Sequence, residues 1–268
     1  MQQQLPALKG LLIDLDGTLY HGAKPIENAD RFIEMLIATE MPYRFVTNNS
    51  SATPEQVADK LSAMGIPANS ELVCTSAQAA ADYISKEKEG ASVFVIGEEG
   101  LRSELAHAGL ELTEEMPDFV VQGIDRGFRY ERGAEAVRYI REGARSIMTN
   151  PDLLLPSTDG LIPGAGSIGA MLQAASGIEP VVIGKPSPIL MNYALQRLGL
   201  PSDETWMVGD NIATDIAAGK AAGCGTILVL TGLTTADNYE KYAQAAGCRP
   251  DLICNNLDIL MTAVTNIR

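Results

Sequence analysis

The chain has 268 residues, a length that suits one large domain or two smaller ones. It carries 34 acidic and 20 basic residues, which gives a formal net charge of −14 at pH 7. Proteins that bind nucleic acids or anionic membranes present clustered lysine and arginine, so this balance argues against both kinds of partner. A small anionic substrate remains compatible with it if a cation or a basic side chain offsets the field.

Cysteine usage and hydropathy indicate a cytoplasmic protein. The four cysteines form no C-x-x-C pair and have no histidine at metal-site spacing, which favours reduced thiols. The first residues lack the basic flank and apolar run of a signal peptide, and no apolar stretch reaches about 18 residues. With only His21 and His107 available, a Ser-His or Cys-His hydrolase is not expected.

Short apolar runs alternate with segments of helical periodicity along the chain. Most runs are rich in Val and Ile without polar alternation, which is typical of parallel strands buried on both faces. The runs are Leu11–Ile13, Tyr43–Val46, Val93–Ile96, Phe119–Val121, Ile147–Met148, Val181–Ile183, Trp206–Val208 and Ile227–Leu230. Helices are predicted at Ala29–Thr39, Pro54–Met64 and Pro188–Leu198. The alternation predicts an α/β fold with a Rossmann-like, doubly wound parallel sheet.

Four of the runs end in polar residues that can carry chemistry. The residues that follow them are Asp14–Thr18, Thr47–Ser50, Gly184–Pro186 and Gly209–Asn211. In open α/β sheets the site lies beyond the carboxyl ends of the strands. We therefore expect four strands of one sheet to deliver to one crevice the side chains of Asp14, Asp16, Thr47, Lys185 and Asp210.

These four segments fall into two blocks that flank a third block with its own strand–helix alternation. We predict a core domain made of residues 1–75 and 180–268. Residues 76–179 would form a smaller α/β domain inserted into that core.

The predicted crevice holds more carboxylates than can stay ionised together without a cation. Asp14, Asp16 and Asp210 lie there, with Asp215 as a candidate fourth. A hard, oxygen-rich site suits Mg²⁺, and Lys185 adds a point charge that suits phosphate. These features predict phosphoryl transfer in which a carboxylate attacks phosphorus, and they do not decide which of the first two aspartates attacks.

Each motif alone has a plainer explanation. The D-x-D-G-T pattern is often a turn capped by aspartate, and Lys-Pro is often a surface dipeptide. Asn49 and Ser50 fit a polar loop before the helix, and Asp215 fits a helix cap. The prediction rests on four elements in order, each at the end of a predicted strand.

The four segments resemble the motifs of the haloacid dehalogenase superfamily of aspartyl-phosphate phosphatases. The matching stretches are Asp14–Tyr20, Thr47–Ser50, Gly184–Pro186 and Gly209–Ile216. The T-N-N-S form of the second motif, and an insert between the second and third, resemble the NagD-like, p-nitrophenyl-phosphatase-type subgroup. The resemblance covers essentially the whole chain and implies a phosphoric monoester hydrolase.

The resemblance also implies a role for each motif residue. Asp14 would be the nucleophile, and Asp16 the general acid and base, with its backbone carbonyl on Mg²⁺. Lys185 would bridge the phosphate and Asp14, and Asp210 would bind Mg²⁺ directly. The other candidates are Thr47, Asn48 and Asn49 for the phosphate, and Asn211 and Asp215 as supports of the metal site.

The insert would then be a cap that selects a small phosphorylated metabolite, such as a sugar phosphate or a nucleoside monophosphate. Asn150 and Asp152 are the candidates for substrate contact, and Asp152 fits a turn cap equally well. Assembly of a homo-oligomer through the cap is left open.

Three other functions are compatible with parts of the sequence: dinucleotide binding, phosphoryl transfer to a second alcohol, and non-catalytic binding of a metabolite. Gly164–Gly169 matches the dinucleotide pattern G-x-G-x-x-G, but Asp159–Pro163 before it is a poor strand, so we expect a glycine-rich helix start. A phosphotransferase or phosphomutase would use the same aspartyl-phosphate chemistry. A non-catalytic, metabolite-binding α/β protein would have no need of the intact Asp14 and Asp16 pair.

Overall fold

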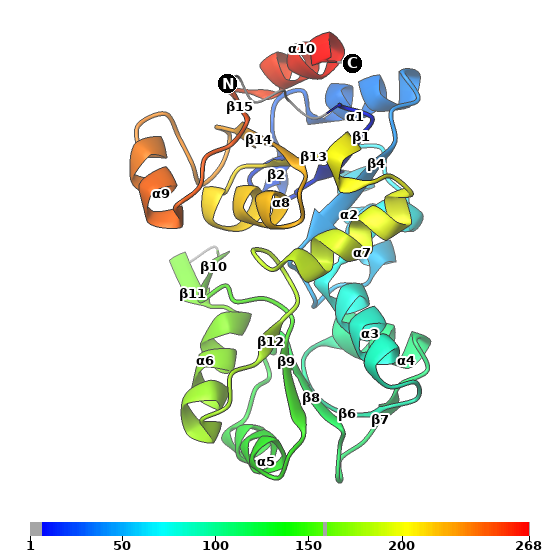
Figure 1. Cartoon of the computed structure of the whole chain (residues 1–268), viewed down its shortest axis with the longest axis vertical. Coiled ribbons are helices and arrows are strands. Elements are labelled where there is room, and N and C mark those ends of the chain that lie inside the picture. The colour runs from blue at the N-terminus through cyan, green and yellow to red at the C-terminus, as the bar shows by residue number, and fades with distance from the viewer. Residues whose placement is uncertain (1–6, 158–159, 268) are drawn as a thin grey trace. The chain divides into compact units, whose positions relative to one another are not determined.

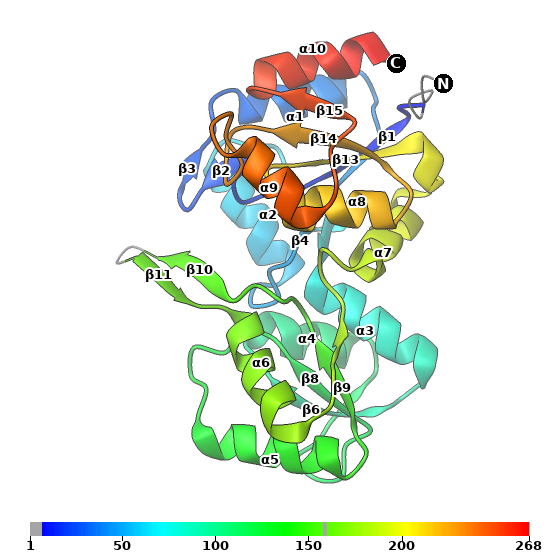
Figure 2. The ribbon, with the colours of Figure 1, turned by 60° about the vertical axis from the view of Figure 1, so that its left-hand side comes forward.

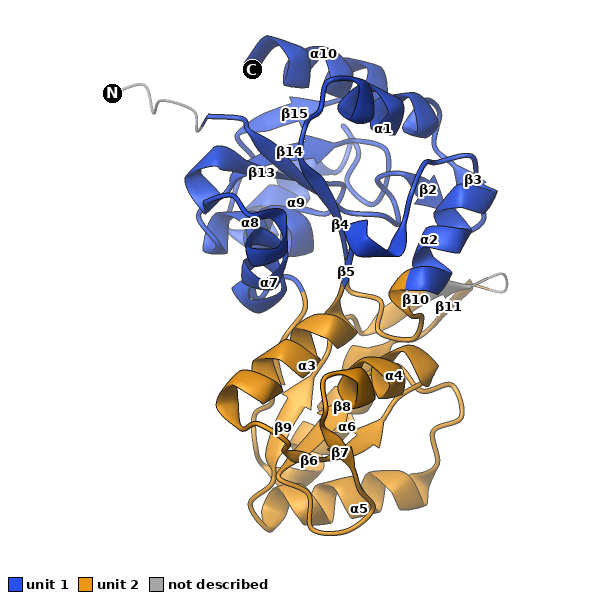
Figure 3. Cartoon of the chain, turned by 90° about the vertical axis from the view of Figure 1, so that its right-hand side faces the viewer, with its two compact units in different colours: residues 1–47, 55–74, 185–268 blue, residues 48–54, 75–184 orange. Residues whose placement is uncertain are grey.

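The chain folds into two compact units, coloured separately in Figure 3. The computed structural model describes residues 7–157 and 160–267, so the N-terminal residues of the signal-peptide argument and Asp159 lie outside the described part. Unit 1 comprises residues 1–47, 55–74 and 185–268, and unit 2 comprises residues 48–54 and 75–184. Each unit is an α/β structure with its own parallel sheet, and the predicted fold class is confirmed.

Unit 1 is built on a six-stranded sheet. Its strand order is β15 (Leu252–Cys254), β14 (Gly225–Val229), β13 (Thr205–Gly209), β1 (Gly10–Ile13), β4 (Tyr43–Thr47) and β5 (Val73–Thr75). Every residue of β1, β13 and β14 is buried. The predicted Val/Ile-rich runs in this unit therefore form strands covered on both faces, as their lack of alternation indicates.

Helices cover both faces of this sheet (Figure 2). On one side α1 (Ala29–Ala38) packs with α10 (Leu257–Ile267), and on the other α7 (Pro188–Leu198) packs with α8 (Ala217–Ala221). The unit also contains α2 (Pro54–Ala63), α9 (Tyr239–Ala246), the hairpin of β2 (Tyr20–His21) and β3 (Lys24–Pro25), and three short turns at Ser70–Leu72, Ser202–Glu204 and Ile212–Ile216. The three helices predicted from periodicity are confirmed to within two residues at their ends.

Unit 2 has a five-stranded parallel sheet with the order β12 (Val181–Val182), β9 (Arg145–Met148), β8 (Phe119–Gln122), β6 (Ser92–Ile96) and β7 (Glu111–Leu112). Its helices are α3 (Ser76–Glu87), α4 (Glu99–His107), α5 (Tyr130–Arg141) and α6 (Ala165–Ser176), traced in Figure 1. Phe94 and Val120 of the sheet pack against Tyr139 and Ile140 of α5 and Leu172 of α6. This cluster forms a hydrophobic core within the unit.

Two expectations about individual strands are wrong. The run Val181–Ile183 was expected in the same sheet as the other motif strands, but β12 pairs with β9 in the sheet of unit 2. It is the half-buried edge strand of that sheet, paired in parallel with β9 alone, so only three motif strands share the sheet of unit 1. The segment judged a poor strand forms β11 (Gly160–Pro163), which pairs antiparallel with β10 (Leu154–Ser157).

The glycine-rich helix start is confirmed, because α6 begins at Ala165. A methyl group on Gly164 or Gly166 would overlap the backbone of Pro151 and Asp152, and one on Gly169 would overlap the side chain of Met148. These glycines therefore serve close packing. The strand before them lies in an antiparallel hairpin, unlike the βαβ unit that a dinucleotide site requires.

The four cysteines are free thiols, as predicted, with Cys74, Cys224 and Cys254 buried. Among the described residues, no helix has the length and apolar character needed to cross a membrane.

Candidate active site

Three motif residues leave adjacent strands of the unit 1 sheet at the same edge. Asp14 follows β1, Thr47 ends β4, and Asp210 follows β13. Strand β1 lies between β13 and β4, in parallel register with both. Because the carboxyl ends of parallel strands meet at one edge, the sheet itself brings these three side chains together.

Lys185 is the buried cation of this edge. It is 2% exposed. Its Nζ donates to Asp14 Oδ1 at 2.5 Å, to Asp215 Oδ1 at 2.6 Å and to the Val46 carbonyl at 3.3 Å. Burial opposes the charge, but the two carboxylates outweigh it and raise the pKa of Lys185 above its ordinary value. The lysine therefore stays charged and ties β1, β4 and the π-helical turn Ile212–Ile216 together.

Asp14, Asp210 and Asp215 form the group that we call the acidic triad. One carboxylate oxygen from each lies within 4.8 Å of the other two, and all three side chains are buried. Burial raises the pKa of Asp14 to about 7, with Lys185 opposing the rise and Asp215 adding to it. Burial and repulsion from the other two carboxylates raise the pKa of Asp210 to about 8. A single lysine is therefore too little positive charge for the triad.

Residues close in sequence to Asp14 and Asp215 form the hydrogen bonds that position these two carboxylates. Asp215 Oδ2 accepts the backbone N–H of Asn211 at 3.0 Å, so both of its oxygens are bonded to the protein. The side chain of Asn211 caps the π-helical turn by accepting from the Ala213 N–H at 2.9 Å. Thr18 Oγ1 donates to Asp14 Oδ2 at 3.2 Å. Asn211 thus shapes the turn that presents Asp215.

Asp16 is placed apart from the acidic triad. Its side chain is exposed, and burial of part of the carboxyl raises its pKa, opposed by the charge of Lys60 and by a hydrogen bond from the Gly22 backbone. The turn that follows Asp16 is held by the Gly17 N–H, which donates to the Tyr20 carbonyl at 2.8 Å. Asp14 and Asp16 consequently face different surroundings, one buried beside Lys185 and the other open to solvent.

A loop that the sequence analysis did not single out closes around Asp210. It comprises residues 230–235, after β14. The Leu233 N–H donates to Asp210 Oδ2 at 2.6 Å, and Thr231 Oγ1 donates to the Gly17 carbonyl at 2.8 Å. Gly17, at φ +92°, and Gly232 both lie so close to Asp210 that a methyl group on either would overlap its carboxylate. In the sequence, this loop is marked only by Thr231 and Gly232, which directly follow the run Ile227–Leu230.

This close approach predicts that Gly232→Ala displaces the Asp210 carboxylate and lowers kcat/KM for phosphomonoesters by roughly 10²-fold, since small misplacements in a site can cost that much. Leu233→Ala is the matched control, because Leu233 binds Asp210 through its backbone and its side chain is 49% exposed. Steady-state kinetics on both variants test this. Equal kcat/KM values of the two variants would contradict the prediction that the position of the Asp210 carboxylate depends on Gly232.

The rest of the T-N-N-S motif belongs to unit 2. The Asn48 carbonyl accepts from Asn150 Nδ2 at 2.8 Å and from Ser76 Oγ at 2.7 Å. Asn48 Nδ2 donates to Asp152 Oδ2 at 3.2 Å. Asn150 is 6% exposed, and its Oδ1 accepts the Asp152 N–H at 3.1 Å. Both candidate substrate contacts of the insert therefore hold the backbone or side chain of Asn48.

The last two residues of this motif have structural partners. Asn49 is exposed, and its Oδ1 accepts from the Ser51 N–H at 2.7 Å, which makes a turn before α2. Ser50 is buried, with its hydroxyl 3.0 Å from Thr149 Oγ1. These contacts favour the polar-loop interpretation of both residues.

We expect Asn150→Ala to lower kcat/KM for different phosphomonoesters by a similar factor of roughly tenfold, since it removes one of the two side-chain hydrogen bonds to the Asn48 carbonyl and the Asn150 acceptor of the Asp152 N–H. Gln173→Ala, which removes an exposed amide on α6, is the control. The measurement is kcat/KM for several phosphomonoesters with each variant. A change in their ranking would instead assign Asn150 to substrate recognition.

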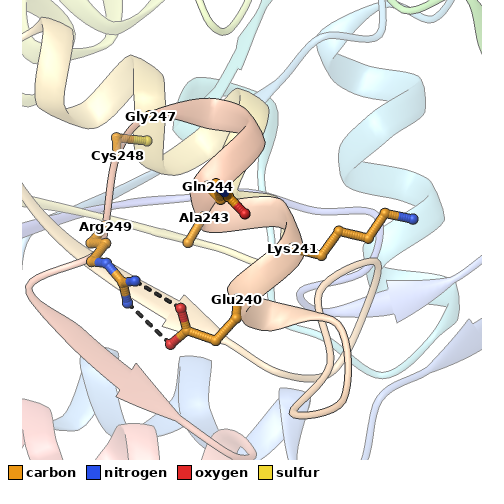
Figure 4. A pocket seen from close by; sticks show the side chains of 7 residues that line it. All are labelled: Glu240, Lys241, Ala243, Gln244, Gly247, Cys248 and Arg249. Carbon is orange, nitrogen blue, oxygen red and sulfur yellow. Dashed lines mark hydrogen bonds and ion pairs between the residues drawn. The ribbon is translucent and has the colours of Figure 1, made fainter.

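A surface hollow elsewhere in unit 1 has no share in these motifs. It has a volume of about 570 Å³ and lies along α9, as Figure 4 shows. Arg249 and Glu240 neutralise one another across it, with Nη2 and Oε2 2.7 Å apart. None of the motif residues lines it.

The chain belongs to the haloacid dehalogenase-like hydrolases. The family model of that name, haloacid dehalogenase-like hydrolase, matches residues 11–111, and a second model of the same group matches residues 182–260. The predicted superfamily is confirmed, and so is the predicted enzyme class, a phosphoric monoester hydrolase.

Relatives cover nearly the whole chain. The 5'-nucleotidase YutF of Bacillus subtilis is 51% identical over 88% of this chain and 94% of its own length. An acid sugar phosphatase of Staphylococcus aureus is 46% identical over 87% of this chain and 90% of its own. The structure of a p-nitrophenyl phosphatase from Archaeoglobus fulgidus superposes with a TM-score of 0.91 at 38% identity, covering 96% of this chain and all of that one. These names fall within the subgroup that the motifs resemble.

Proposed function

We propose that the protein is a Mg²⁺-dependent phosphatase of small phosphomonoesters that works through a phosphoryl group on Asp14. The observation that carries the proposal is the contact of the buried Asp14 carboxylate with Lys185, beside Asp210 and Asp215. A buried carboxylate next to a cation is oriented and positioned for attack. The same cation can neutralise the phosphate that approaches it.

The reaction then has two steps on the same phosphorus. In the first, an Asp14 carboxylate oxygen bonds to phosphorus while the bond from phosphorus to the ester oxygen breaks. Asp16 gives its proton to that ester oxygen, so that the alcohol leaves neutral. In the second, Asp16 takes a proton from water as the water oxygen bonds to phosphorus. The bond between phosphorus and Asp14 breaks, and inorganic phosphate is released.

The donor set of the acidic triad fits a hard divalent cation. Three buried carboxylates share one lysine, and the raised pKa values of Asp14 and Asp210 reflect the positive charge that the site still needs. Asp14, Asp210 and the backbone carbonyl of Asp16 would hold Mg²⁺. The ion would supply charge neutralisation for the dianionic phosphate. Asp215, bonded to Lys185 and Asn211, would orient the lysine.

The names of the relatives support a phosphorylated metabolite as substrate. They include a 5'-nucleotidase, an acid sugar phosphatase and p-nitrophenyl phosphatases. The metal and phosphate chemistry would belong to unit 1. Unit 2, which carries Asn48, Asn150 and Asp152, is the proposed cap that chooses among alcohol groups.

Release of phosphate from p-nitrophenyl phosphate tests the proposed function. We expect activity with Mg²⁺, loss of nearly all of it in excess chelator, and recovery when Mg²⁺ is restored. Asp210→Asn should lose activity by roughly 10²-fold or more, since it removes a proposed metal ligand. Asp203→Asn, an exposed aspartate, should behave as the wild type.

Full activity in excess chelator would contradict the metal assignment. Transfer of the phosphoryl group to a second alcohol, with little free phosphate, would instead favour a phosphotransferase or phosphomutase on the same site.

A further inference from the structure

Lys60 is a cation beside Asp16 that the proposed mechanism does not use. It lies on α2, and its Nζ is 3.9 Å from the centre of the Tyr20 ring. Tyr20 is 6% exposed and is the last residue of the first motif. It is tied to the motif by a bridge with Asp16 and by the hydrogen bond of its carbonyl with the Gly17 N–H. The ring thus places the ammonium group next to the turn that carries Asp16.

The charge of Lys60 lowers the pKa of Asp16, and Lys60 forms no ion pair within the described residues. Within residues 7–157 and 160–267, no carboxylate oxygen lies within 4.0 Å of its Nζ. Among the charges that lower the pKa of Asp16, that of Lys60 contributes most, followed by that of His21. The chain has a net charge of −14, yet within its described residues Lys60 lies near Asp16 without forming an ion pair.

We propose that Lys60, in unit 1, adds to the specificity set by the cap by binding an anionic oxygen group, carboxylate or phosphate, on the alcohol part of the substrate. This rests on the proposed function, in which Asp16 protonates the ester oxygen. The alcohol must then leave past Asp16, so its first few atoms also lie next to Lys60. An ammonium held by an aromatic face keeps its N–H donors for such a group.

A purely structural role for Lys60 makes a different prediction. The aliphatic stem of a lysine can cover an aromatic ring without any use of its charge. Lys60→Met keeps that stem and removes the charge, whereas Lys60→Arg keeps the charge. Lys241→Met, on α9, makes the same change in net charge elsewhere in unit 1.

The test compares two phosphoesters that share a three-carbon skeleton, 3-phosphoglycerate and glycerol 3-phosphate, which differ by a carboxylate and a hydroxymethyl group. Each competes against hydrolysis of p-nitrophenyl phosphate, and the competition constants are compared. We expect the wild type and Lys241→Met to prefer 3-phosphoglycerate by at least about fivefold, near the upper end for an exposed ion pair. Lys60→Met should abolish the preference, Lys60→Arg should retain it, and added salt should weaken it.

A wild type without this preference, or a Lys60→Met variant that keeps it, would overturn the inference. Equal weakening of both competitors by Lys60→Met would also overturn it, since that result indicates support of Asp16 or of the fold. Absence of any p-nitrophenyl phosphate hydrolysis by the wild type would mark a failure of the proposed function instead.

Discussion

The contact of Lys185 with Asp14 and Asp215 is the interaction on which the site depends. Three carboxylates crowd one buried edge, and repulsion among them would be unfavourable without a cation. Lys185 compensates part of this charge at distances of 2.5 and 2.6 Å. What remains is a deficit of positive charge, which a divalent cation can offset so that a phosphate dianion can bind.

The fold meets this constraint with strands that come from distant parts of the chain. Neighbouring strands β13, β1 and β4 supply Asp210, Asp14 and Thr47 at one sheet edge. Lys185 does not follow a strand of this sheet. It lies just after β12, which belongs to the sheet of unit 2. Backbone groups complete the edge: the Leu233 N–H binds Asp210, and the Asn211 N–H binds Asp215. The carboxylates are thus held by hydrogen bonds that leave them little freedom to separate.

Much of this could be predicted from the sequence, because buried parallel strands leave unbroken Val/Ile runs and the four motifs follow those runs. The origin of Lys185 could not, since a short run such as Val181–Ile183 does not reveal which sheet it joins. The loop at Gly232 was missed because its contacts with Asp210 use the backbone, which has no side-chain signature. The hydrogen bond of Asn150 to the Asn48 carbonyl joins residues 102 positions apart, a pairing that no local pattern encodes.

Transfer of the phosphoryl group to Asp14 is the central claim, and trapping it is the most direct test. The Asp16→Asn variant is mixed with p-nitrophenyl phosphate, whose leaving group needs no proton, and is quenched with acid before mass analysis of its peptides. The proposed mechanism predicts the added mass of one phosphoryl group on the peptide that contains Asp14, because the second step lacks its base. It predicts none when Asp14→Asn is combined with that variant. A phosphoryl group on another residue, or turnover by Asp14→Asn at more than about a tenth of the wild-type rate, would contradict it.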